Sequence, residues 1–206
     1  MKALVIVDMQ NDFMPGGALG VPGADGLIQI INALIPQFSL IVASQDWHPA
    51  DHISFASNHP GKKPGDQIEV AGQTQVLWPV HCVYHTFGAE LASRLNKEKI
   101  AACFYKGTDK DIDSYSAFFD NAGRRSTGLG EYLKSSGVTD VYLVGVATDY
   151  CVLYSALDAI DLDFKVHVIT GACRPINLDP GDEERALAAI AAKGGEIETT
   201  DKHGAV

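Results

Sequence analysis

Short apolar runs alternate with longer amphipathic stretches along the 206 residues of the chain. The apolar runs predict buried strands, because a strand that is covered on both faces lacks the polar alternation of a half-exposed one. The predicted strands are Ala3–Asp8, Ser39–Ser44, Ile100–Tyr105, Val141–Gly145, Lys165–Thr170 and a short final strand at Glu196–Thr199.

The stretches between these runs predict helices, since apolar residues such as Leu27, Ile31 and Leu34 recur at helical spacing. The predicted helices are Ala24–Phe38, Ala89–Leu95, Gly130–Ser136, Asp149–Ile160 and Glu183–Lys193. Two segments have no regular pattern, a polar loop at Gly107–Arg124 and a long stretch at Gln45–Phe87. A stretch of that length in a compact domain is usually functional or disordered, and its aromatic residues and histidines favour a functional role.

Repeated alternation of strand and helix predicts an α/β fold with a mostly parallel sheet of about six strands and helices on both faces. The three layers would form one domain over residues 1–206, which is long enough to bury a sizeable core. The chain has no internal repeat, linker or low-complexity tract.

The net charge of −10 argues against nucleic acid and anionic membranes as partners, because both select basic surfaces. Asp8 interrupts the first apolar run, no cleavage site follows it, and no run is long enough to span a membrane, so we expect a cytoplasmic protein. Four widely spaced cysteines without a C-x-x-C pair indicate reduced thiols. The sequence leaves the oligomeric state open, a homo-oligomer included.

Chemically active side chains follow the predicted strands. In parallel sheets, sites lie outside the carboxyl ends of the strands, and this edge would receive Asp8, Asp46, Lys106 and Cys151. Cys151 falls in the first turn of a helix, which favours a thiolate, and a nearby ammonium would lower the thiol pKa further. Asp8 could take the thiol proton, with Lys106 as the activating cation. Each residue also has an ordinary explanation, as a cap, an exposed lysine or a core thiol.

The other cysteines have less distinctive positions. Cys103 lies inside a predicted strand and Cys173 follows the last long one, so both are predicted to be core residues.

The stretch SQDWHPADH places Asp46, His48 and His52 within seven residues. Carboxylate and imidazole groups at this spacing are typical of metal ligands, whereas histidines of a polar loop can equally face water. The stretch alone leaves both interpretations open.

Six motifs, in order along nearly the whole chain, resemble those of the nicotinamidases (pyrazinamidases) in the isochorismatase-like cysteine hydrolase superfamily. The motifs are VDMQNDF (Val7–Phe13), DWHPADH (Asp46–His52), WPVHCV (Trp78–Val83), YKG (Tyr105–Gly107), DSYSAFFD (Asp113–Asp120) and GVATDYCV (Gly145–Val152). The resemblance implies the isochorismatase-like hydrolase fold. It also implies hydrolysis of a small amide, nicotinamide to nicotinate and ammonia through a cysteine thioester, in NAD salvage, with pyrazinamide as a second substrate.

The resemblance also implies roles for individual residues. The catalytic triad would be Asp8, Lys106 and Cys151. The ligands of one divalent metal ion, zinc first with iron or manganese as alternatives, would be Asp46, His48, His52 and His81. A cis peptide at Val146–Ala147 would let the backbone N–H groups of Ala147 and Cys151 form an oxyanion hole. The flat substrate pocket would be lined by Phe13, Leu19, Trp78 and Tyr115.

Three further histidines are expected to play no part in the site, with His59 and His85 solvated in loops and His167 structural. An isochorismate hydrolase is a competing interpretation, but it needs no cysteine nucleophile. N-carbamoyl amidohydrolases keep the triad but generally lack this metal loop. A non-catalytic metal-binding or thiol redox protein would bind metal without amide turnover. GLGEY (Gly128–Tyr132) is a poor dinucleotide-binding motif, because no strand leads into it and its third glycine is missing.

Overall fold

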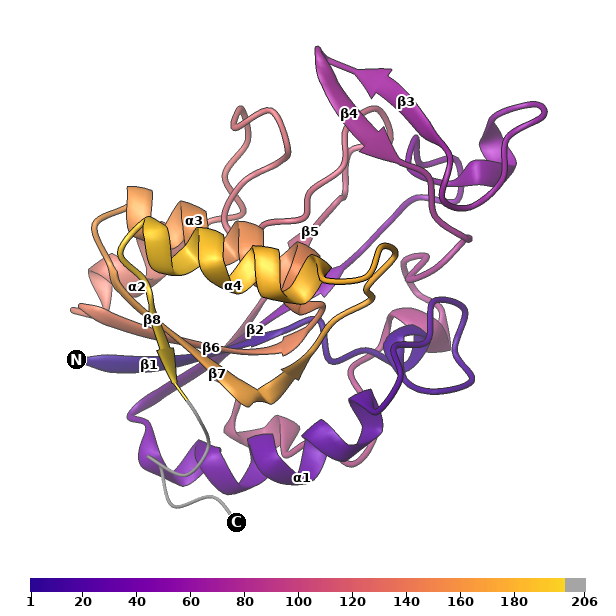
Figure 1. Ribbon diagram of the computed structural model, residues 1–206. Coiled ribbons are helices and arrows are strands. Elements are labelled where there is room, and N and C mark those ends of the chain that lie inside the picture. The colour runs from indigo at the N-terminus through magenta and orange to yellow at the C-terminus, as the bar shows by residue number, and fades with distance from the viewer. Residues whose placement is uncertain (199–206) are drawn as a thin grey trace.

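The computed structural model describes residues 1–198 and contains a six-stranded sheet. Its strands are β1 (Lys2–Val7), β2 (Leu40–Asp46), β5 (Ala102–Lys106), β6 (Asp140–Val146), β7 (Lys165–Arg174) and β8 (Glu196–Glu198). They lie in the order β5-β2-β1-β6-β7-β8, and every pairing is parallel (Figure 1). The predicted parallel sheet of about six strands is therefore confirmed. The last residue of the predicted final strand, Thr199, lies outside the described residues.

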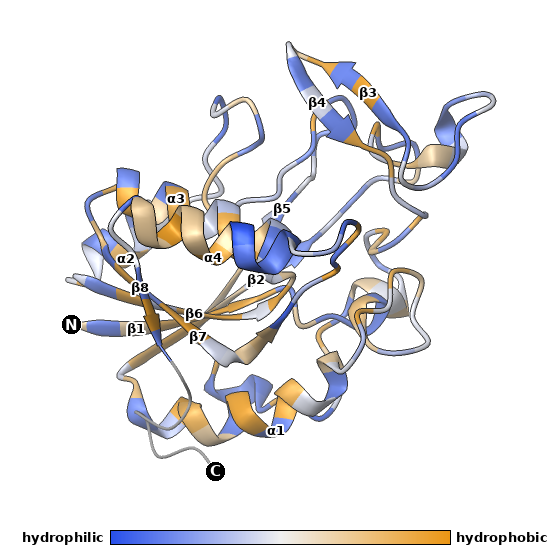
Figure 2. Cartoon of the chain, viewed as in Figure 1, coloured by the Kyte–Doolittle hydropathy of each residue, from blue (hydrophilic) through white to orange (hydrophobic). Residues whose placement is uncertain are grey.

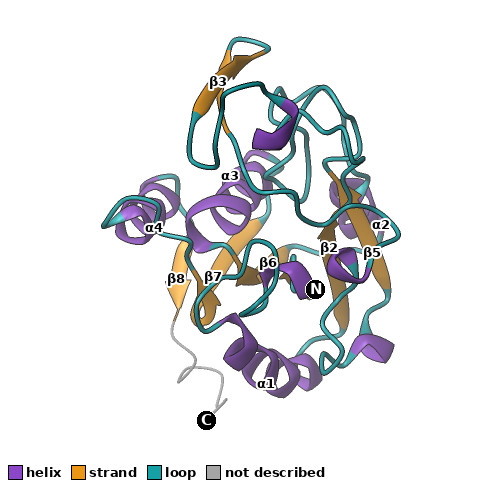
Figure 3. Cartoon of the chain, turned by 90° about the vertical axis from the view of Figure 1, so that its right-hand side faces the viewer, coloured by secondary structure: helices purple, strands orange, loops and turns teal. Residues whose placement is uncertain are grey.

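Helices cover both faces of this sheet, which confirms the three-layer α/β/α architecture (Figures 1 and 3). The helix α1 (Ala24–Leu34) packs on one face, and α2 (Leu129–Ser135), α3 (Leu153–Asp161) and α4 (Asp182–Ala192) pack on the other. The aliphatic strands form the centre of the molecule, while polar residues gather in the first turn of α4 (Figure 2). Burial of apolar side chains on both faces of the strands is the main source of stability in such a fold.

Because all strands run the same way, their carboxyl ends share one edge, at the right of Figure 1 and facing the viewer in Figure 3. The long segment at Gln45–Phe87 crosses this edge and is less irregular than predicted. It contains a hairpin of β3 (Gln67–Val70) and β4 (Gln73–Val76). Ala71 and Gly72 form the turn with φ of +53° and +81°, the left-handed pair that a tight two-residue hairpin requires.

The prediction of a helix at Ala89–Leu95 was wrong. The backbone of this stretch forms hydrogen bonds with the segment after β1 instead. The Asn11 N–H donates to the Glu90 carbonyl (2.9 Å), and the Ala92 N–H donates to the Met9 carbonyl (2.8 Å). The apolar side chains are buried as the pattern predicts, but through pairing with a distant segment. Tertiary contacts have overridden a helical pattern.

The helix predicted at Asp149–Ile160 consists of two parts, a π-helical turn at Thr148–Val152 and then α3. Such turns often occur at functional sites. Cys103 was predicted to be a core residue and is exposed, because β5 is an edge strand with one face open. Cys173 is buried, as predicted. No helix within residues 1–198 is long and apolar enough to cross a membrane.

Candidate active site

The side chain of Lys106 lies fully buried where β5 ends, and its ammonium joins the groups that the strand ends deliver. Its Nζ lies 2.8 Å from Oδ2 of Asp8 and 3.4 Å from Sγ of Cys151, and it also pairs with Oδ1 of Asp46. It donates a further hydrogen bond to the Ser114 carbonyl (3.0 Å). The structure thus brings the three residues of the expected triad together around one ammonium, which neutralises part of a buried negative cluster.

Asp8 directly follows β1 and is completely buried. Its backbone has a φ of +49°, an uncommon value for a residue with a side chain and one often found at functional sites. Oδ1 accepts a hydrogen bond from the Ser44 hydroxyl (2.7 Å). Burial raises the pKa of Asp8 above its ordinary value, although Lys106 acts in the opposite direction. A carboxylate with a raised pKa accepts a proton more readily.

Cys151 lies in the turn after β6, with 7% of its surface exposed. Burial raises the pKa of its thiol well above the ordinary value, and the carboxylates of Asp8 and Asp46 raise it further, while Lys106 lowers it. Lys106 thus lowers the thiol pKa in the predicted direction, but burial and the two carboxylates, which the sequence-based prediction left out, outweigh it. The resting group is a thiol that must lose its proton before it attacks.

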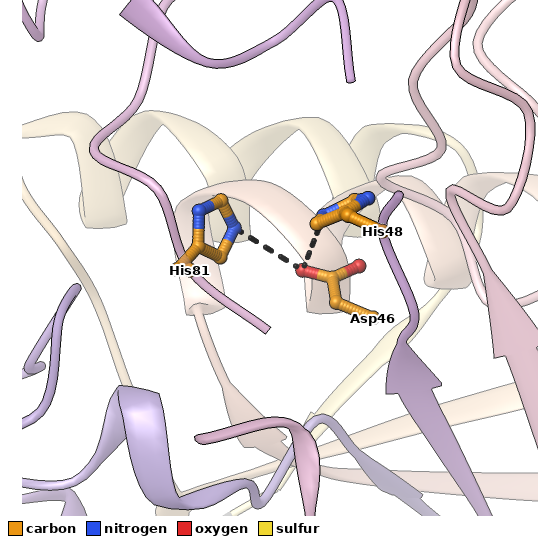
Figure 4. A group of neighbouring side chains, drawn as sticks. All are labelled: Asp46, His48 and His81. Carbon is orange, nitrogen blue, oxygen red and sulfur yellow. Dashed lines mark ion pairs between the residues drawn. The ribbon is translucent and has the colours of Figure 1, made fainter. Parts of the chain in front are cut away.

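A second cluster, of Asp46, His48 and His81, adjoins the first because Asp46 also pairs with Lys106. Figure 4 shows its three side chains. Oδ2 of Asp46 lies 3.6 Å from Nε2 of His48 and 3.6 Å from Nε2 of His81. All three side chains are buried. Burial alone would raise the pKa of Asp46, but the ammonium of Lys106 holds it well below its usual range.

The other ring nitrogens show which tautomers these histidines adopt. Nδ1 of His48 donates to the Gly107 carbonyl (2.9 Å), and Nδ1 of His81 donates to the Pro79 carbonyl (2.8 Å). The proton on Nδ1 leaves a lone pair on Nε2, which faces Asp46. Metal-binding histidines have this arrangement, and one carboxylate with two imidazoles suits a divalent ion such as zinc, iron or manganese. The residues present therefore fit a divalent metal.

His52 lies beside this cluster and forms a different group. Possible ligand atoms of His48, His52 and Asp113 lie within 4.8 Å of one another. This set of possible metal ligands is separate from the set of Asp46, His48 and His81, although both contain His48. Nδ1 of His52 accepts a hydrogen bond from the Ser54 N–H (3.3 Å), and Nε2 has no hydrogen-bond partner among the described residues. Burial lowers the pKa of His52 to about 4, so its ring is neutral at neutral pH.

Asp113 was not predicted as a site residue. It is buried, and it accepts hydrogen bonds from the side chain of Gln75 (3.0 Å) and from the Ser114 N–H (2.8 Å). The available signal was its position as the first residue of the motif DSYSAFFD.

A narrow pocket connects the nucleophile with the metal cluster. Its wall contains Phe13, Leu19, Asp46, His48, Trp78, His81, Asp113, Tyr115, Ala147, Tyr150, Cys151 and Ile176. Each residue that was predicted to contact substrate is among them, whereas Ile176 was not predicted as a site residue. The ring of Tyr150 meets those of Trp78 and Tyr115 edge to face, with centroids 4.9 and 5.4 Å apart. Aromatic walls of this kind select a flat ring.

Other predicted features of the chain can be located as well. The peptide bond Val146–Ala147 is cis, as the resemblance implied. His85 is exposed, whereas His59 is half-buried and its Nε2 donates to the Ile53 carbonyl (2.7 Å). Nδ1 of His167 lies 2.7 Å from a carboxylate oxygen of Glu198, a contact between strands that agrees with a structural role.

The parallel α/β fold, with a buried cysteine, carboxylate and ammonium at its carboxyl edge, defines a class of cysteine hydrolase. Comparison with known families identifies this class. A family model described as an isochorismatase domain matches residues 2–202. The chain therefore belongs to the isochorismatase family, and the predicted relationship is confirmed.

Within this family, four curated relatives that are 39–47% identical to this chain are nicotinamidases. The nicotinamidase of Escherichia coli (strain K12) is 44% identical over 96% of this chain and 94% of its own length. A solved nicotinamidase/pyrazinamidase from Acinetobacter baumanii superposes with a TM-score of 0.95 at 46% identity, over 98% of this chain and 97% of the other.

Two further solved structures bear on ligands. The yeast nicotinamidase bound to the inhibitor nicotinaldehyde superposes with a TM-score of 0.91 at 36% identity, over 97% of this chain and all (100%) of the other. The pyrazinamidase of Pyrococcus horikoshii in complex with zinc superposes with a TM-score of 0.79 at 40% identity, over 96% and 98% of the two chains.

Proposed function

We propose that this chain hydrolyses nicotinamide to nicotinate and ammonia through a thioester on Cys151, as a step in NAD salvage, and that it also converts pyrazinamide to pyrazinoate. The observation that carries this proposal is the buried ammonium of Lys106, in contact with Asp8 and Cys151 at one end of a flat aromatic pocket. The nicotinamidases and pyrazinamidases that resemble this chain support it.

Acylation begins with transfer of the Cys151 proton to Asp8, whose raised pKa suits it to the task. The sulfur then attacks the carboxamide carbon, and the C=O electron pair moves onto oxygen. The backbone N–H groups of Ala147 and Cys151 would stabilise this oxyanion. When the tetrahedral intermediate collapses, the C–N bond breaks, Asp8 returns the proton to the leaving nitrogen, and ammonia departs from a thioester.

In deacylation Asp8 again acts first as a base and then as an acid. Asp8 takes a proton from water, the resulting hydroxide attacks the thioester carbon, and the C–S bond breaks; the carboxylic acid formed loses its proton to solvent and departs as nicotinate. The sulfur leaves as a thiolate beside the ammonium of Lys106, which favours that charge, and it regains its proton from Asp8. Lys106 thus stabilises the anionic sulfur at both ends of the cycle.

Asp46, His48 and His81 would hold the metal, with His52 and Asp113 beside it. When bound, a divalent ion would supply a Lewis acid that coordinates the pyridine nitrogen and so orients the ring. We propose zinc, in agreement with the zinc-bound pyrazinamidase that the chain resembles, and iron or manganese as alternatives. Direct ligation by His52 stays a prediction, which the metal content of a His52→Ala variant would test.

The competing interpretations have less support. An isochorismate hydrolase would have no use for Cys151 in contact with an ammonium. An N-carbamoyl amidohydrolase would not need the cluster of Asp46, His48 and His81. A non-catalytic metal or thiol protein would leave the ordered contacts of Asp8 unexplained.

Release of ammonia from nicotinamide by the purified, metal-loaded protein is the direct test, with nicotinate quantified by chromatography. Turnover should also occur with pyrazinamide. Tight metal binding without any ammonia release would support the non-catalytic interpretation.

We also propose that residues 1–206 form one domain, which the match of a single family model over residues 2–202 supports. The cytoplasmic location and the oligomeric state stay predictions.

A further inference from the structure

The segment between β7 and α4, residues 175–181, carries Ile176 into the wall of the substrate pocket. The segment has no helix or strand to fix its backbone. Asn177 adopts a left-handed conformation with a φ of +53°. A pocket wall without regular structure needs other hydrogen bonds to hold it in place.

Asp149 supplies these bonds. Its Oδ1 accepts a hydrogen bond from the Ile176 N–H (2.9 Å), and its Oδ2 accepts one from the Asn177 N–H (2.7 Å). The Asn177 side chain in turn accepts from the Glu183 N–H (3.0 Å) in the first turn of α4. Hydrogen bonds to a carboxylate are stronger than neutral ones, so Asp149 fixes the backbone on which Ile176 stands.

Asp149 lies two residues before Cys151 in the same turn and is 7% exposed. Both carboxylate oxygens are used on the segment 175–181. The nucleophile is held by different contacts, since Lys106 joins Cys151 to Asp8. The contacts of Asp149 therefore concern the substrate wall and leave the triad to its own hydrogen bonds.

We propose that Asp149 is a positioning residue that sets the width of the substrate pocket by holding Ile176 against it. The proposal deepens the proposed function and rests on it. Loss of the carboxylate frees Ile176, and a flat ring loses one of its apolar contacts. Binding of the ring weakens, whereas the acylation chemistry at Cys151 continues.

The test compares Asp149→Ala, Ile176→Ala and the double variant in nicotinamide hydrolysis. Each single substitution should raise KM about tenfold and leave kcat within about threefold, since loss of an apolar contact in a pocket weakens binding by roughly this factor. The double variant should have the KM of the single variants, because both changes remove the same contact. Asp149→Asn keeps one acceptor oxygen and should give an intermediate KM, even if Asp149→Ala folds poorly.

Asn32→Ala is the matched control. Asn32 also holds an irregular segment by two bonds, donating to the Arg94 carbonyl (2.9 Å) and accepting from the Asn96 N–H (2.8 Å), and none of these residues lines the pocket. Its KM should equal that of the unsubstituted chain.

Two results would overturn the proposal. A double variant whose KM rises by the product of the single effects would mean that Asp149 does not act through Ile176. A fall in kcat at constant KM in Asp149→Ala would place its action on the nucleophile turn.

Protection of Cys151 from iodoacetamide by nicotinate measures binding without turnover and should weaken in parallel with the rise in KM. Failure of the proposed function appears separately, as no ammonia from the unsubstituted chain.

Discussion

The state of the Cys151 thiol can be tested with two substitutions that should shift its pKa in opposite directions. The ammonium of Lys106 lies 3.4 Å from Sγ and lowers the thiol pKa. Lys106→Met removes this ammonium, so the thiol pKa should rise. Asp8→Asn removes a carboxylate that raises the thiol pKa, so the pKa should fall. Both variants should lose nicotinamide turnover, because one lacks the activating cation and the other lacks the base.

Coulomb's law gives the size of the first effect. At 3.4 Å and an effective dielectric constant of about 20, the ammonium attracts a thiolate by roughly 5 kcal/mol. One pKa unit corresponds to about 1.4 kcal/mol, so complete loss of this attraction would raise the thiol pKa by roughly three to four units. Without Lys106, either Asp8 or Asp46 takes up a proton, which cancels part of the change, and we expect a rise of at least about one unit.

The assay is the pH dependence of iodoacetamide labelling at Cys151, resolved by peptide mass spectrometry. A Cys103→Ala background removes the exposed thiol that would otherwise react first. Lys106→Met should move the labelling profile to higher pH, and Asp8→Asn should move it to lower pH. Shifts in the same direction, or an unchanged profile in Lys106→Met, would refute the account of how these charges act on the sulfur.

Other predictions concern the nucleophile, the metal and the substrate. Cys151→Ala should abolish turnover with metal content intact, whereas Cys103→Ala should keep full activity and change stability by less than about 0.5 kcal/mol, measured by thermal unfolding, because its side chain is exposed. Gly107→Ala should weaken metal binding at least about tenfold, seen as a lower bound metal content in elemental analysis. A Cβ at position 107 would lie 2.3 Å from Cε1 of His48, and the residue has a φ of +62°. Benzamide lacks the ring nitrogen and should fall roughly tenfold or more below nicotinamide in kcat/KM. Chelation, or His48→Ala, should depress nicotinamide turnover far more than benzamide turnover; equal losses would instead place the metal in the chemical step.

Continuous aliphatic runs predicted the central strands well, because burial on both faces leaves no room for polar residues. The rule that parallel strands share a carboxyl edge then places Asp8, Asp46, Lys106 and Cys151 together from the sequence alone. The same apolar pattern does not tell a central strand from an edge strand. For that reason it placed Cys103 in the core.

What the sequence could not supply is the balance of charges at short range. The spacing of motifs brings an ammonium near Cys151, but the direction of the thiol pKa depends on two carboxylates and on burial, which only the folded geometry sets. The same limit applies to the pocket wall. Ile176 follows the last long strand in an unremarkable loop, and its backbone N–H and that of Asn177 donate hydrogen bonds to Asp149, which lies 27 residues before Ile176 in the chain. Residues that act directly on substrate can be recognised by their chemistry, whereas residues that position them become visible only through their contacts.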